Sequence, residues 1–143
     1  MRRMFLAVSG VALGAALMVQ MTVVRAEQPQ DAAVIDKTMK TVGPAFGAAR
    51  KAIGGGMMAE ARTSAETLSK AFVETEAFFK SHGKADGVEL AQAAKKASDA
   101  IAAAANAEAA NAAAGELAKT CAGCHATYRD KAADGSFSFK PGA

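Results

Sequence analysis

The chain of 143 residues has 17 basic and 14 acidic side chains, but Arg2, Arg3 and Arg25 fall in its first 26 residues. The remaining 117 residues carry 14 charges of each sign, scattered along the chain, which excludes the basic footprint of a nucleic-acid-binding protein. They suit a single domain, and because they are rich in Ala, lack Trp and contain one Tyr, their composition favours helix.

Residues 1–26 have the features of an export signal. A basic start is followed by a largely apolar stretch at 4–24, and Ala26 is a small residue suited to cleavage. The same apolar stretch, at 21 residues, is long enough to span a bilayer as an uncleaved anchor. We therefore expect a cleaved signal and a periplasmic domain at 27–143, with membrane contact only if the signal is not cleaved.

Two amphipathic helices are predicted in the first half of this domain. The first covers about 31–53, is followed by three glycines, and contains Pro44, whose missing N–H predicts a kink. The second covers about 57–81 and ends at His82 before a glycine. Both carry apolar stripes at helical spacing. These stripes are Ile35, Met39, Val42, Phe46, Ala49 and Ile53, then Met58, Ala61, Ala65, Leu68, Phe72, Thr75 and Phe79.

Two further helices are predicted in the second half. The third begins near Asp86 as a plausible N-cap, and the fourth ends near Lys131, with the boundary between them near Asn106 or, alternatively, Asn111. Four such helices with short connections predict an all-α, antiparallel up-down-up-down four-helix bundle. The stripes are Leu90, Ala94, Ala97, Ile101 and Ala104, then Leu117, Cys121, Cys124 and Tyr128.

A short C-terminal tail follows the fourth helix. Asp134-Gly135 is a turn signal. Residues 136–140 alternate between polar and aromatic side chains, so we expect them to lie extended against the bundle.

The fourth helix carries the strongest motif in the chain. Cys121, Cys124 and His125 form a C-x-x-C-H sequence, which is typical of covalent c-type haem attachment. Their spacing places all three side chains on one helix face, where two thiols can form thioethers to haem vinyl groups and the imidazole can bind iron. A redox disulfide would need a βαβ setting, and a zinc site would need His82 as a fourth ligand. We therefore expect one covalent haem c.

The bundle also suggests a second axial ligand. His125 lies six residues before Lys131, the expected end of the fourth helix, which is roughly 9 Å along the helix axis. Met39 lies eight residues after Asp31, the expected start of the first helix, which is roughly 12 Å along that helix axis. In an up-down bundle these two levels nearly match. Met39 is therefore a candidate sixth ligand, with simple core packing as the alternative. We expect His82 to be an exposed loop residue.

Two segments resemble a known family. The run from Cys121 to Lys131, C-A-G-C-H-A-T-Y-R-D-K, resembles the end of a cytochrome c-prime, a class II c-type cytochrome. The segment at 39–43, M-K-T-V-G, is similar to the first helix of the low-spin, Met-ligated members. Where the family often has Arg, four residues before that Met, this chain has Ile35.

The resemblance implies a four-helix haem domain with a defined set of site residues. Cys121 and Cys124 would be the thioether sites and His125 the proximal iron ligand, with Met39 the sixth ligand of the low-spin branch. Arg129 matches a basic residue near the proximal face. Such bundles often dimerise, so a homodimer is a further expectation.

The expected function is electron transport in the periplasm between redox partner proteins. No nucleophile–base pair or paired carboxylates suggest catalysis, so we do not expect an enzyme. The first alternative is a five-coordinate haem that binds nitric oxide or carbon monoxide, with Met39 only blocking the distal face. The second is a haem-bearing subunit held to the membrane by an uncleaved 4–24 segment.

Overall fold

The computed structural model describes residues 29–131, 133 and 137–140. The expected signal at 1–26 and the expected turn at Asp134-Gly135 lie outside these residues. None of the helices in the described part of the chain combines the length and the hydropathy that a membrane span requires.

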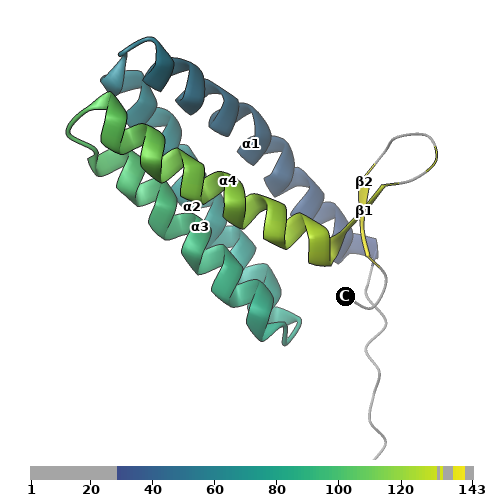
Figure 1. The fold of residues 1–143 in the computed structure, drawn as a ribbon. Helices are drawn as coiled ribbons and strands as arrows, with labels where there is room; N and C mark the ends of the chain where they lie inside the picture. Colours follow the sequence, from purple (N-terminus) through teal and green to yellow (C-terminus); the bar gives the residue numbers. More distant parts are fainter. Residues whose placement is uncertain (1–28, 132, 134–136, 141–143) are drawn as a thin grey trace, which may run out of the picture.

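Four helices pack side by side as a bundle (Figure 1). They are α1 (Pro29–Gly54), α2 (Met58–Ser81), α3 (Ala85–Ala103) and α4 (Ala107–Tyr128). Each connection is short, and in Figure 1 the chain reverses direction at each of them. Each helix packs mainly on its neighbour in sequence, whereas α1 and α4 contact each other only sparsely. The all-α four-helix bundle predicted from the stripes is confirmed.

The boundary between α3 and α4 lies at one of the two asparagines considered. The side-chain oxygen of Asn106 accepts a hydrogen bond from the backbone N–H of Ala109 at 2.9 Å, which is an N-cap interaction. Asn111 lies inside α4. The boundary near Asn106 is confirmed, and the alternative is wrong.

The predicted N-cap role of Asp86 is wrong. Helix α3 begins at Ala85, and its N-cap position is occupied by Lys84, which makes no side-chain capping bond. The carboxylate of Asp86 instead accepts a hydrogen bond from the hydroxyl of Tyr128 on α4. The carboxylate of Asp86 therefore bonds to a residue of another helix and does not cap its own helix.

The prediction that α4 continues to near Lys131 is also wrong. The helix ends at Tyr128, and β1 (Arg129–Lys131) pairs antiparallel with β2 (Phe137–Phe139). Arg129 has an extended backbone and lies opposite Phe139, while its N–H still donates to the carbonyl of His125 in the last turn of α4. Phe139 packs against the bundle, which confirms the extended tail for residues 137–139.

The buried side chains form two clusters. The first cluster lies toward the α1–α2 and α3–α4 connections and consists mostly of alanines around a few large side chains, among them Leu68, Phe72, Ile101 and Leu117. The second cluster lies toward the β strands. It contains Ile35, Phe78, Phe79, Ala91 and Tyr128. Large aromatic rings are thus concentrated at the end of the bundle where α4 finishes.

Glycine is required at one position in this second region. A Cβ atom built on Gly87 of α3 would overlap the ring of Phe79, which is 1% exposed and cannot move away easily. We expect Gly87→Ala to lower the free energy of unfolding by about 1–3 kcal/mol, because overpacking outweighs the gain in helix propensity. Urea unfolding followed by circular dichroism measures this.

Gly115 of α4 is the matched control, because a Cβ atom there has no neighbouring heavy atom within 4 Å. Gly115→Ala should raise the free energy of unfolding by about 0.5–1 kcal/mol. Equal stabilisation by both substitutions would contradict the close packing of α3 on Phe79.

Candidate functional site

The C-x-x-C-H motif lies in the last two turns of α4. Cys121, Cys124 and His125 are all half-buried, and neither cysteine forms a disulfide. Cys121 packs against the first cluster and Cys124 against the second. The two thiols therefore lie where the two clusters of the core meet.

Met39 of α1 lies at the same level of the bundle. It is half-buried and packs against both the first and the second cluster. The residue before it, Thr38, is turned toward α2, where its hydroxyl contacts Glu74 at 3.2 Å. Met39 and the motif thus come from α1 and α4, which contact each other only sparsely. Iron ligation by Met39 stays a prediction.

Burial sets the protonation states of the motif. It raises the pKa of the Cys121 thiol, and burial together with the nearby Cys121 and Asp86 raises the pKa of Cys124 to about 11. Burial and then the charge of Arg129 lower the pKa of His125. At neutral pH the thiols are therefore protonated, and the imidazole is in the neutral form that can bind a metal.

The free thiols of Cys121 and Cys124 and the imidazole of His125 are the groups that covalent haem attachment uses. Among the described residues, no group of three or more His, Cys, Asp and Glu side chains is arranged to hold a metal ion. A covalent haem uses two thiols as anchors and an imidazole as an iron ligand, and a methionine sulfur can serve as a second iron ligand.

Arg129 lies directly after α4. Its side chain is exposed, its backbone N–H donates to the carbonyl of His125, and its charge lowers the pKa of that histidine. The structure therefore places Arg129 next to the imidazole side of the motif, although in β1 rather than one helical turn further along α4.

His82 lies in the turn directly after α2, as expected, but the prediction that it is exposed is wrong. It is the half-buried C-cap of α2, and its Nδ1 lies 2.7 Å from the carbonyl oxygen of Phe78. Its ring also packs on the ring of Phe78, with centroids 4.3 Å apart. Capping the helix and covering an aromatic ring account for the placement of this histidine.

The hydrogen bond between Tyr128 and Asp86 was not apparent from the sequence. The two oxygens are 2.5 Å apart, and the bond joins the end of α4 to the start of α3. The ring of Tyr128 packs against the rings of Phe79 and Phe139, with centroid distances of 4.6 and 5.5 Å. The inward stripe of the fourth helix indicated that Tyr128 is buried, but local sequence gave no signal for its partner.

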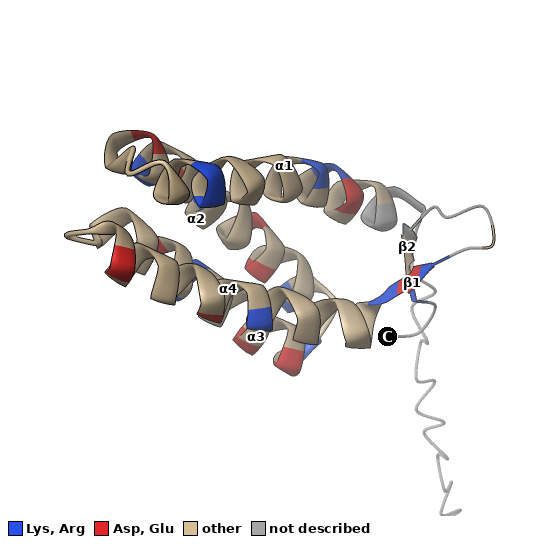
Figure 2. Cartoon of the chain, turned by 45° about the horizontal axis from the view of Figure 1, so that its top comes forward, with Lys and Arg blue, Asp and Glu red and all other residues tan. Residues whose placement is uncertain are grey.

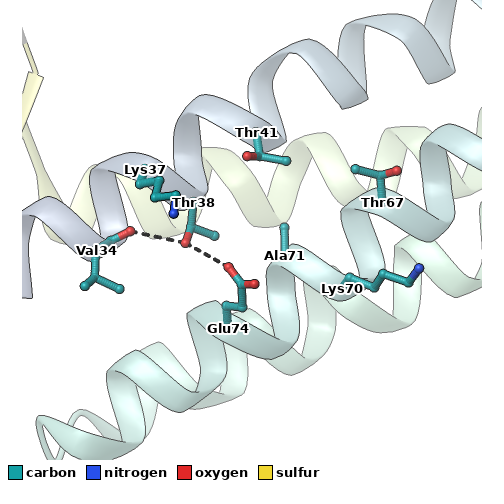
Figure 3. Close-up of a pocket in the computed structure, with 8 residues that line it drawn as sticks. All are labelled: Val34, Lys37, Thr38, Thr41, Thr67, Lys70, Ala71 and Glu74. Carbon is teal, nitrogen blue, oxygen red and sulfur yellow. Dashed lines mark hydrogen bonds between the residues drawn. The ribbon is translucent and has the colours of Figure 1, made fainter.

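Acidic and basic residues are interspersed over the outer faces of the helices (Figure 2), partly as local pairs such as Lys40–Asp36 and Lys95–Asp99. A groove of about 380 Å³ lies between α1 and α2 (Figure 3). Two lysines, three threonines, Glu74 and two small apolar side chains line it, and it contains no cysteine, histidine or methionine.

Comparison with protein-family models, with curated proteins and with solved structures finds no match to this chain. The likeness to the cytochrome c-prime family therefore stays a prediction from the two segments quoted above.

The bond between Tyr128 and Asp86 predicts a characteristic pH dependence. Burial, and then the hydrogen bond to Asp86, raise the pKa of Tyr128 to about 12. Because the chain has one Tyr and no Trp, ultraviolet difference absorption of the phenolate follows this residue alone. We expect it to titrate well above the ordinary value of 10.0. Titration near that value would contradict the bond.

The free energy of unfolding should depend on pH in both the acidic and the alkaline range. The hydrogen bond from Tyr128 lowers the pKa of Asp86 below 3.8, so its contribution is present above that pH and is lost as pH falls through the lowered value. The contribution of the raised Tyr128 pKa is present below pH 10.0 and is lost as pH rises through about 12. The destabilisation by Tyr128→Phe should therefore be largest between these limits, and a pH-independent difference would contradict this.

Proposed function

We propose that this protein is a periplasmic c-type cytochrome, and not an enzyme, that carries electrons through one covalently bound haem c. The observation that carries the proposal is the arrangement of the motif on α4. Two free thiols and a neutral imidazole share one half-buried face, at the level where the two core clusters meet.

Each residue of the site has a distinct role in this proposal. Cys121 and Cys124 would hold the group through thioethers, and His125 would bind the iron through its neutral ring. Met39 would supply the sixth ligand from α1. The bound haem would provide the one-electron chemistry. The charge of Arg129 favours the neutral form of His125, which keeps the lone pair available.

Location and partners follow from the same proposal. Residues 1–26 would direct export, which suits a covalent haem because its attachment is completed outside the cytoplasm. The partners would be redox proteins that give electrons to the haem or take them from it. A homodimer belongs to the proposal only through the resemblance to the cytochrome c-prime family.

One observation favours a second candidate function. Met39 contacts apolar side chains of both core clusters, as expected for a residue that only fills space. In that case the haem would be five-coordinate, and Met39 would cover the side on which nitric oxide or carbon monoxide binds. The same residue therefore distinguishes an electron carrier from a gas-binding protein.

Covalent attachment is tested with the cysteines. We expect Cys121→Ala and Cys124→Ala singly to leave one thioether, and the double variant to hold no haem after denaturation and acid extraction. Mass spectrometry of the denatured chain measures this. As a matched control, His82→Ala leaves the motif intact and should keep both thioethers. Covalent haem in the double variant would refute the central proposal.

The sixth ligand is tested with Met39. We expect the ferric protein to be low-spin with a His–Met charge-transfer band, and Met39→Ala to abolish that band, admit carbon monoxide and lower the reduction potential. Met58, which is half-buried against the first cluster, is the control. Truncating either Met costs roughly 2–5 kcal/mol if it is well packed, but Met58→Ala should leave the band in place. A high-spin ferric spectrum of the intact protein would favour gas binding instead.

A further inference from the structure

The end of α4 is capped by a residue from the C-terminal tail. The last carbonyl groups of a helix have no partner within the helix and need donors from outside it. Lys140 provides two of these donors. Its backbone N–H donates to the carbonyl of Tyr128 at 2.9 Å, and its Nζ donates to the carbonyl of Ala126 at 2.7 Å. The carbonyl of His125 accepts from the backbone N–H of Arg129.

The neighbouring residue, Phe139, holds the same turn from the side. Its ring is stacked on Tyr128 and meets Phe78 edge to face, with centroid distances of 5.5 Å in both cases. Because Phe78 belongs to α2, Phe139 connects α2 with the end of α4. The hydroxyl of Tyr128 adds α3 through its bond to Asp86. The last turn of α4 is therefore held by two other helices and by β2.

This turn contains half of the candidate site. Ala126, whose carbonyl Lys140 caps, directly follows His125, and Cys124 packs in the same cluster as Phe139. A helix end without caps frays, whereas covalent anchoring and iron ligation need side chains held to within a fraction of an ångström. The residue directly after α4, Arg129, donates only its backbone N–H to the helix end, to the carbonyl of His125. The carbonyls of Ala126 and Tyr128 accept from Lys140 instead.

We infer that Phe139 and Lys140 are positioning residues, which hold the last turn of α4 and thereby fix Cys124 and His125 for the haem. We call these contacts of Phe139 and Lys140 with the end of α4 the clamp. That the clamp serves haem binding rests on the proposed function, whereas the contacts themselves are present whatever the function is.

Amide hydrogen exchange of the purified full chain, resolved along α4, tests the clamp. Lys140→Ala removes one of the two donors, so we expect exchange of the amides at 125–128 to become about fivefold faster, while those at 111–118 stay unchanged. Lys140→Arg keeps a donor and should restore slow exchange. Lys119→Ala is the matched control, because Lys119 is an exposed α4 residue whose Nζ contacts Glu116 at 2.7 Å. Unchanged exchange in Lys140→Ala would overturn the inference.

A second measurement separates positioning from mere stabilisation. In the haem-loaded protein, Phe139→Ala and Lys140→Ala should alter the Soret circular dichroism, which reports the placement of the haem in its site, and Lys119→Ala should not. Val73→Ala, at a valine that is 49% exposed, is the control for loss of an apolar side chain. Faster exchange with an unaltered Soret signal would limit Phe139 and Lys140 to a structural role and refute positioning. A chain without haem would refute the proposed function, and exchange alone would then decide whether the clamp exists.

Discussion

Close contact between alanine faces is the constraint on which this bundle depends. Each buried alanine removes little apolar surface from water, so the helices gain stability only by approaching closely along their whole length. The first cluster is built in this way, with alanines from all four helices around a few large side chains. The second cluster consists mainly of large side chains, and it packs aromatic rings between α2, α4 and β2. The candidate site lies where these two kinds of packing meet.

That location explains the electrostatics of the site. Apolar surroundings penalise charge, so the thiols stay protonated and the imidazole stays neutral. The polar groups nearby are largely occupied by one another: Asp86 accepts from Tyr128, and the carbonyl of Ala126 accepts from Lys140. In the proposed function, this half-buried face of α4 is the one that would take the haem.

Most of the fold could be predicted from the sequence because it depends on local signals. Helical spacing gave the four helices, and Asn106 gave the α3–α4 boundary through a cap that spans three residues. The wrong predictions concern residues whose conformation or hydrogen bonding depends on a partner that is distant in the sequence. Asp86 looks like a cap until Tyr128 is placed beside it, and Arg129 looks helical until Phe139 lies opposite it. The same holds for the candidate site. The spacing of Cys121, Cys124 and His125 can be read from the sequence, whereas the capping of their helix by Lys140 cannot, because it depends on the tail folding back onto α4.

The sparse contact between α1 and α4 has a consequence for how the chain assembles. Most helix packing joins neighbours in sequence, so the hairpins α1–α2, α2–α3 and α3–α4 can form early and rapidly. The contact between α1 and α4, which we call the α1–α4 seam, closes a long loop and adds few contacts. Met39 and the C-x-x-C-H motif lie on opposite sides of that seam. A chain that closes in this order would leave the face of α4 that carries the thiols uncovered by α1 until the last step, when the three hairpins are already formed.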